Sequence, residues 1–337
     1  MSAAPPPLAP DGGQQPPSVV RRRLSLAALL SVPLGLFPVT GVPAMLLGLA
    51  GLRAVNASDG RLRGRRLALA GMTLGALGTA LLAIGTLLVI VFQLRTVSQR
   101  AECANHLREI GMGINRYAEA HNGELPPGTV ANAALPPQRR LSWMAAVLPF
   151  LTEGAAAGPK RPAEKKWQAL AGKLDLERAW DDPANAAASG VNVPAYFCPA
   201  LVRPDPLRQP GLTTYVGLAG VGPDAARLPK QDRRAGVFGY DRVITRQDVT
   251  AGISFTMMVA ETTRDLGPWA AGGPPTVRGL APDETHYVGV GRPFGGLHPD
   301  GANVLWVDTS VRLVKSAVAP EVFRAQATLA GAAAPDE

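Results

Sequence analysis

The chain has 337 residues, with 34 Lys or Arg against 26 Asp or Glu, for a formal net charge of +8. Eight Arg lie within residues 1–66 beside only two acidic residues, so the rest of the chain is nearly neutral. Together with an aromatic content of only 5%, this distribution excludes the basic face of a nucleic-acid-binding protein, and we expect no nucleic-acid partner. An apolar content of 47% excludes a wholly disordered chain, and two Cys are too few for a zinc site of three or four cysteines.

The two ends of the chain have little to bury. Residues 1–20 contain six Pro and few large apolar side chains, which predicts a disordered Pro-rich tail. Residues 331–337 are expected to form a short flexible tail. The ordered part of the chain is therefore predicted to lie between them.

Two long uncharged stretches follow the N-terminal tail, at residues 24–52 and 67–92. Because about 20 apolar residues cross a bilayer core, both are predicted to be transmembrane helices, within a two-span membrane domain at 21–94. Pro33, Pro38 and Pro43 interrupt the first stretch and predict a kinked or partly re-entrant span. Buried core helices or a cleaved secretory signal are the alternatives. This region resembles a small two-helix bacterial membrane domain of unknown function.

Charge alone leaves the membrane topology open. If both stretches cross fully, five Arg of the connecting loop face five Arg on the opposite side, so the positive-inside rule does not choose between orientations. The resulting expectation is a multi-pass protein of the cytoplasmic membrane, with the lipid bilayer as its partner.

The second stretch continues into a polar segment that keeps a helical pattern. Apolar or small residues recur at spacings of three and four from Val97 through Leu107 and Ile114 to Ala118. No Pro interrupts residues 67–122, and Asn122-Gly123 is a typical helix end. We therefore expect one long helix, the first half in lipid and the second packed on a domain.

From Pro126 onward, β-rich runs alternate with turn residues, which predicts an α+β domain at 95–330 with an antiparallel sheet. Helices are expected in two segments, 141–151 and 163–174. Strands are expected at 213–220, 235–240, 254–262, 303–307 and 311–315, the last two joined as a hairpin through Asp308-Thr309-Ser310.

Several segments carry a resemblance: RAECANHLREIGMGINRYAEAHNGELPPG, LSWMAAVLPFL, YFCPA and FGGLHPDGANVLWVDTSVRLV. They resemble the pseudopilin-like, prepilin-processing-associated proteins with a His-x9-Asp-Gly motif, here His298 and Asp308. The resemblance implies a pilin-like head anchored by its N-terminal helix outside the cytoplasmic membrane. Three features depart from the family: RRRLSLAALL lacks a prepilin peptidase site and two spans replace one, Thr309 replaces the motif's Gly, and an upstream Asp-Gly-x-Ser-Asn-Thr pattern reads AGISFT at residues 251–256.

Cys103 and Cys198 are the only two cysteines. We expect a disulfide that ties the long helix to the head, which suits an extracytoplasmic location. Two buried free thiols are the alternative.

Four residues are weak candidates for a metal site: His298, Asp300, Asp308 and Glu261. A His with carboxylates in loops could hold a divalent cation such as calcium. The alternative is that His298 bonds backbone near the hairpin and Asp308 forms its turn. No other cofactor is expected.

The expected function is a membrane-anchored, extracytoplasmic pilin-like protein that binds or scaffolds in the cell envelope. It is not expected to be an enzyme or to be processed as a prepilin, and its partner would be an envelope protein or a second copy. The alternatives are an envelope metal-binding factor or enzyme using His298, Asp308 and Glu261, and a cytoplasmic-facing regulatory domain.

Overall fold

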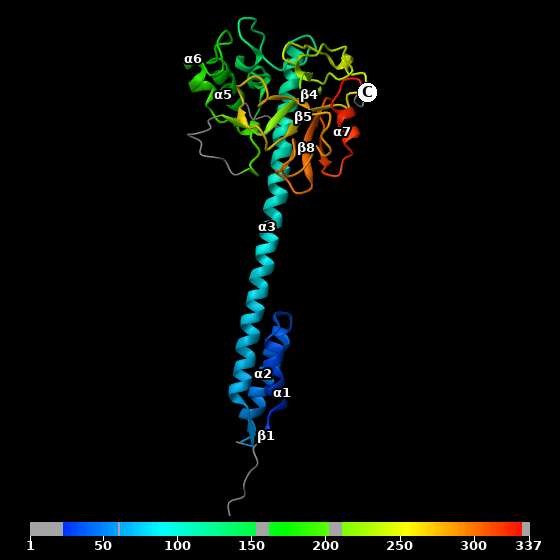
Figure 1. The fold of residues 1–337 in the computed structure, drawn as a ribbon. Helices are drawn as coiled ribbons and strands as arrows, with labels where there is room; N and C mark the ends of the chain where they lie inside the picture. Colours follow the sequence, from blue (N-terminus) through cyan, green and yellow to red (C-terminus); the bar gives the residue numbers. More distant parts are fainter. Residues whose placement is uncertain (1–22, 60, 153–161, 202–210, 332–337) are drawn as a thin grey trace, which may run out of the picture. The chain divides into compact units, whose positions relative to one another are not determined.

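The computed structural model describes residues 23–59, 61–152, 162–201 and 211–331, so the predicted tail at 1–20 and most of that at 331–337 lie outside the described residues. The chain forms two compact units, Met1–Gln93 and Leu94–Glu337. Each unit is described by itself below. Helix α3, Arg65–Ala120, contributes to both (Figure 1).

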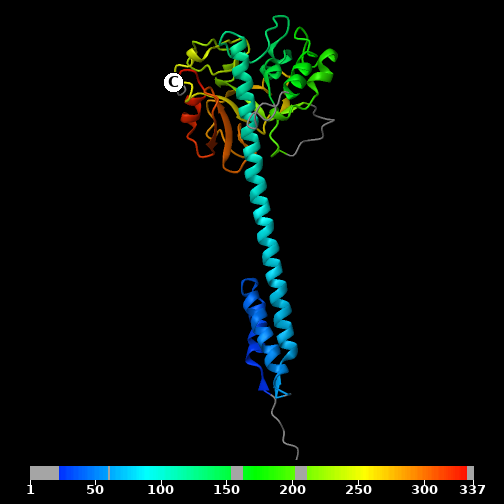
Figure 2. The same cartoon turned by 180° about the vertical axis from the view of Figure 1, so that it is seen from behind.

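The N-terminal unit contains a helical hairpin in place of the first predicted span. Helix α1, Leu26–Gly35, ends close to Pro38–Thr40, a single 3₁₀ turn, and α2, Gly41–Asn56, runs back beside it. Ser25 caps α1, since its side chain accepts a hydrogen bond from the backbone N–H of Ala28. The hairpin, residues 26–56, lies beside the first turns of α3 in both ribbon views (Figures 1 and 2).

A short pairing closes the base of the hairpin. Strand β1, Arg23–Leu24, pairs in parallel with β2, Leu62–Arg63, which immediately precedes α3. The N–H of Ser25 donates to the carbonyl of Arg63 at 3.0 Å. The chain therefore enters and leaves the hairpin at the same end.

Small residues let the three helices approach closely. A Cβ added to Gly71 of α3 would lie within 2.8 Å of three atoms of Ser31 on α1, and one added to Gly75 would lie 2.6 Å from the carbonyl of Gly41 at the start of α2. This is the small-residue packing that brings membrane helices together. Large side chains on the outside of the hairpin stay exposed, for example Leu46 and Phe37.

The prediction of two complete membrane spans, and with it a multi-pass anchor, is not confirmed. Within the described residues, α3 is the one helix long and apolar enough to cross a membrane. With 10 and 16 residues, α1 and α2 fall short of the roughly 20 residues that cross a bilayer core. The prolines noted in the sequence account for the division, since Pro38 opens the 3₁₀ turn between the two helices.

The single long helix is confirmed: α3 has 56 residues. Its buried stripe begins later than predicted, because Val97 is exposed and the first fully buried side chain of the stripe is Cys103. From there Leu107, Ile110 and Ile114 pack into the core of the C-terminal unit. Gly111 lets Leu305 approach the helix, since an added Cβ would lie 2.9 Å from its side chain.

The α+β class is also confirmed. A five-stranded sheet in the order β7-β4-β5-β8-β9 forms the centre of the C-terminal unit. Its strands are β4 Tyr215–Val221, β5 Met257–Glu261, β7 Val277–Leu280, β8 Gly301–Trp306 and β9 Val311–Lys315. Strands β4, β5, β8 and β9 are antiparallel neighbours, whereas β7 runs parallel to β4, so the sheet is mixed and not wholly antiparallel as expected.

Each face of the sheet carries its own core. Alternate residues separate the two, so Tyr215 and Leu305 face the core that contains α3, whereas Val216 and Val304 face a second core. The second core is closed by Phe323 of α7, Pro320–Gln326. Figures 1 and 2 show α7 and the C-terminal part of α3 on different sides of the sheet.

Short elements complete the unit. The predicted helices form, as α4 Trp143–Val147 with a following 3₁₀ turn at Leu148–Phe150, and as α5 Pro162–Ala171. Helix α6, Pro183–Ser189, is capped by Asp182. A two-stranded pair joins β3, Leu212–Thr213, to β6, Gly267–Pro268. Further 3₁₀ turns lie at Pro137–Arg139, Pro194–Tyr196, Ala225–Arg227 and Arg246–Asp248.

The strand predicted at 235–240 does not form. Strand β5 pairs with β4 only at residues 215–217, and beyond it this segment pairs with β4 through one antiparallel bridge, between Ala235 and Gly220. The N–H of Phe238 donates to the carbonyl of Leu218 at 3.0 Å, but the pairing does not extend into a strand. Phe238 fills the space above Gly217, where an added Cβ would lie 2.5 Å from its ring. The apolar side chains that suggested a strand are therefore core residues of an irregular segment.

Candidate functional site

A disulfide joins Cys103 of α3 to Cys198, which follows the 3₁₀ turn at Pro194–Tyr196, and the predicted pairing is thereby confirmed. The Cα atoms are 5.1 Å apart, within the usual range for a disulfide. Both residues are fully buried. The bond closes a loop of 95 residues between the long helix and the head.

Backbone-directed hydrogen bonds hold the two cysteines in place. The N–H of Cys198 donates to the hydroxyl of Thr214 at 2.7 Å, just before β4. The phenol of Tyr215 donates to the carbonyl of Cys103 at 3.3 Å. Burial raises the pKa of Tyr215 well above its ordinary value, and the nearby charge of Glu261 adds to the effect, so this phenol keeps its proton.

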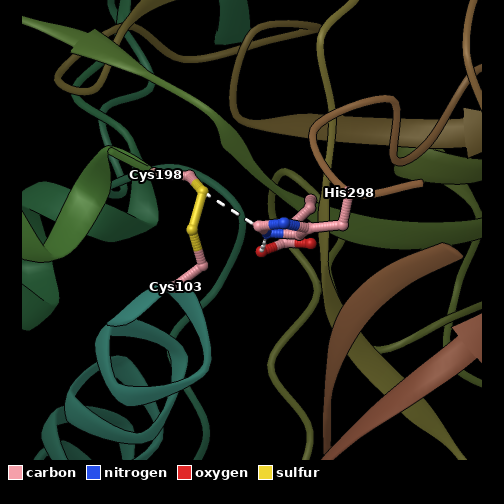
Figure 3. Close-up of side chains that lie close together, drawn as sticks. Cys103, Cys198 and His298 are labelled. Atoms are coloured by element: carbon pink, nitrogen blue, oxygen red, sulfur yellow. Dashed lines mark hydrogen bonds and ion pairs between the residues drawn. A yellow bond between two sulfur atoms is a disulfide. The ribbon is translucent and has the colours of Figure 1, made fainter. Parts of the chain in front are cut away.

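His298 points its ring at the disulfide (Figure 3). Its Nε2 lies 3.6 Å from Sγ of Cys198 and 3.4 Å from Oε1 of Glu261. His298 precedes β8 and Glu261 is the last residue of β5, and the β5–β8 pairing brings them together. His298 is 3% exposed and Glu261 is fully buried.

Asn303 of β8 holds Glu261 through two hydrogen bonds. Its backbone N–H donates to Oε2 of Glu261 at 2.7 Å, and its side-chain amide donates to Oε1 at 3.0 Å. The carboxylate is therefore fixed in orientation, as buried charged groups require. Sequence reasoning missed Asn303, although a polar residue inside an otherwise apolar strand was a signal for it.

The other two predicted ligands do not join this cluster. Asp300 is exposed and lies 3.7 Å from the guanidinium of Arg100. Asp308 lies in the β8–β9 turn, where its Oδ1 accepts hydrogen bonds from the N–H and the hydroxyl of Ser310. Burial favours a higher pKa for Asp308, but the bonds from Ser310 outweigh it and the pKa is lowered. Asp308 therefore forms the turn of the hairpin, which was the alternative to a metal ligand considered from the sequence.

The four buried residues Cys103, Cys198, Glu261 and His298 form what we call the disulfide cluster. One ligand-type atom from each lies within 4.8 Å of the others. Sequence reasoning identified all four but placed them in two separate sites, because their neighbourhood depends on strand pairing across residues far apart in the chain. The burial of the cluster leaves little of it open to a substrate.

Comparison with known proteins gives one result. The sequence profile of a family described as SBP_bac_10, Protein of unknown function (DUF1559), matches residues 93–321, which is more than half of the chain and covers the disulfide cluster. No curated protein and no solved structure matches. The chain therefore belongs to the DUF1559 family of proteins of unknown function.

Proposed function

We propose that this protein is a membrane-anchored scaffold or binding protein of the cell envelope, with its C-terminal unit outside the cytoplasmic membrane. Its anchor consists of one spanning segment, the apolar half of α3, and one re-entrant hairpin, residues 26–56. The observation that carries the proposal is the pairing of β1 with β2, since it puts both ends of the hairpin at one end of that spanning segment.

The depth of the hairpin supports a re-entrant arrangement. Gly41, which starts α2 near the tip, lies against Thr79 of α3, about 14 residues after that helix begins. At about 1.5 Å per residue this is roughly 21 Å, less than the roughly 30 Å of a bilayer core. Around the tip, Phe37 and Val39 are exposed, as expected for side chains in contact with lipid.

A re-entrant hairpin changes the charge argument on topology. Six described Arg now lie at the base of the hairpin, whereas two follow the apolar half of α3; they are Arg23, Arg53, Arg61, Arg63, Arg65 and Arg66, against Arg95 and Arg100. Because Lys and Arg collect on the cytoplasmic side, the base is cytoplasmic and the chain after the span is outside. The disulfide supports the same side, since disulfides persist in oxidising compartments.

The burial of the disulfide cluster supports a structural role over catalysis. A catalytic His or Glu must reach its substrate, whereas His298 and Glu261 are almost completely enclosed. The architecture, a long N-terminal helix packed on a sheet, resembles that of pilins. Because a hairpin precedes the helix and the segment RRRLSLAALL lacks the Gly and Glu of a prepilin peptidase site, we propose that the protein acts without prepilin processing, through an envelope protein or a second copy.

Protease treatment of spheroplasts tests the location of the head. We expect added trypsin to digest the head in spheroplasts and to leave it intact in inside-out vesicles, and the protein to stay with the membranes after an alkaline wash. Protection of the head in spheroplasts would indicate a cytoplasmic-facing domain and would overturn the proposal.

His298→Ala tests the non-catalytic role. We expect the free energy of unfolding to fall, because the carboxylate of Glu261 and the disulfide lose a buried neighbour. We expect no catalytic activity to be lost with it. A hydrolytic activity on envelope substrates that disappears in this variant while the fold persists would contradict it. Arg264→Ala, at an exposed position, is the matched control.

A further inference from the structure

We propose that the disulfide cluster is a redox-dependent zinc site: when the Cys103–Cys198 bond is reduced, both sulfurs, Nε2 of His298 and a carboxylate oxygen of Glu261 bind one Zn²⁺. The residue types fit the metal, because structural zinc sites combine Cys and His ligands, and carboxylate oxygens also serve. The four ligand-type atoms already lie within 4.8 Å of one another. This inference does not depend on the membrane orientation.

The distances around His298 match the edges of a zinc tetrahedron. Zinc bonds of about 2.3 Å to sulfur and about 2.0–2.1 Å to nitrogen and oxygen give edges of about 3.6 Å between sulfur and nitrogen and about 3.4 Å between nitrogen and oxygen. Nε2 of His298 lies 3.6 Å from Sγ of Cys198 and 3.4 Å from Oε1 of Glu261. Nε2 of His298 therefore already lies at the distance expected between zinc ligands from both Sγ of Cys198 and Oε1 of Glu261.

The distance between His298 and Glu261 is too long for a direct charge-assisted hydrogen bond. A charge-assisted bond between imidazole and carboxylate would bring nitrogen and oxygen to about 2.7–2.9 Å. The observed 3.4 Å exceeds that range although both side chains are buried and the carboxylate is held firmly. An ion between the two groups would satisfy both.

Asn303 supplies the outer shell that metal sites need. It donates two hydrogen bonds to Glu261, through its backbone N–H and its side-chain amide. Bonds of this kind orient a metal-ligating carboxylate, and their loss typically weakens metal binding by about 10–100-fold. Glu261 is thus prepared as a ligand.

Reduction of the disulfide precedes zinc binding. A dithiol donates two electrons and two protons to the Cys103–Cys198 bond and itself becomes a cyclic disulfide. The two cysteine thiols then release their protons to solvent as Zn²⁺ binds both sulfurs. Since the sulfur–sulfur bond and the zinc site use the same sulfurs, the two states exclude each other. Because the cluster is buried, zinc enters while the reduced chain folds or opens locally.

Zinc titration of the full-length protein in detergent micelles tests the proposal. The disulfide is reduced completely in mild urea with a water-soluble phosphine, thiols are counted, and the chain is returned to buffer with Zn²⁺. We expect one zinc per reduced chain after dialysis, none per oxidised chain, and slower reoxidation when zinc is present. Cobalt in place of zinc should give the absorption of a tetrahedral thiolate site.

Variants separate a built site from adventitious binding. Cys198→Ala and His298→Ala should each lower zinc affinity by more than 100-fold, and Asn303→Ala by about 10–100-fold. His286→Gln, at an exposed position outside the cluster, is the matched control and should bind as wild type.

Two results would overturn the proposal: a reduced wild-type chain that retains no zinc, or zinc retained equally by both ligand variants. If the reduced chain is unfolded, zinc must restore its circular dichroism and thermal transition, and failure to do so also overturns the proposal.

Discussion

At the scale of single residues, the structure gives a physical meaning to Thr309, which the sequence had marked as unusual. Thr309, where the resembling family has Gly, adopts a left-handed backbone with φ of +67°. This conformation is costly for a β-branched residue and is the one that glycine adopts freely. Thr309 therefore holds the β8–β9 turn at a cost in stability.

Thr309→Gly should raise the free energy of unfolding by about 0.5–1 kcal/mol, because relief of the left-handed strain exceeds the added freedom of the unfolded chain. Urea denaturation followed by tryptophan fluorescence measures it. Thr309→Ala keeps the Cβ and is the control; an equal gain in that variant would show that the strain is not the cause.

His106 predicts a dependence of stability on pH. Burial lowers its pKa, an effect only partly opposed by Glu102 and by the carbonyl of Phe197 that lies 3.1 Å from Nδ1. The native state thus resists protonation while the unfolded chain takes up a proton near pH 6.5, so stability contributed by neutral His106 is complete above that pH and is lost as pH falls below it.

His106→Asn should flatten this decline in unfolding free energy between about pH 7 and pH 5, measured by urea denaturation at each pH. His286→Asn, at an exposed position, is the control and should leave the slope unchanged. A slope that persists in His106→Asn would contradict the assignment.

At the scale of elements, the sequence predicted those whose pattern is local. The long helix, the two helices after it and the β8–β9 hairpin depend on nearby residues and are present. Two predictions that failed depend on partners far along the chain: 235–240 forms one bridge with β4 instead of a strand, and β7 pairs with β4 in parallel. The disulfide followed from having only two cysteines, whereas the contact of His298 with Glu261 required the β5–β8 register.

The glycine-rich packing of the N-terminal unit gives a test at this scale. Gly71→Leu should displace the hairpin from α3, because even a Cβ at this position would overlap Ser31. Gly85→Leu is the matched control, since no atom lies within 4 Å of an added Cβ there.

The readout is the rate at which a thiol reagent labels Ser31→Cys in detergent micelles, since Ser31 is fully buried where the hairpin packs on Gly71. We expect several-fold faster labelling when Gly71→Leu is added and no change with Gly85→Leu. Equal labelling in both would show that the hairpin does not depend on this contact.

At the scale of the whole molecule, the basic excess of the chain has a specific location. The formal charge of +8 comes largely from Arg around the base of the hairpin, beside apolar helices whose outer side chains are exposed. Sequence alone left orientation undecided because it assumed a first span that crosses completely. In our proposal, a hairpin that returns to its own side of the membrane supplies the missing asymmetry.

Site-directed labelling with a membrane-impermeant maleimide tests this account most directly. Single substitutions Arg23→Cys, Arg61→Cys and Lys173→Cys are made at exposed positions, with the native disulfide intact and unreactive. In spheroplasts we predict labelling of Lys173→Cys alone, and in inside-out vesicles labelling of Arg23→Cys and Arg61→Cys. Labelling of Arg23→Cys together with Lys173→Cys from the outside would mean two complete spans and would contradict the re-entrant hairpin.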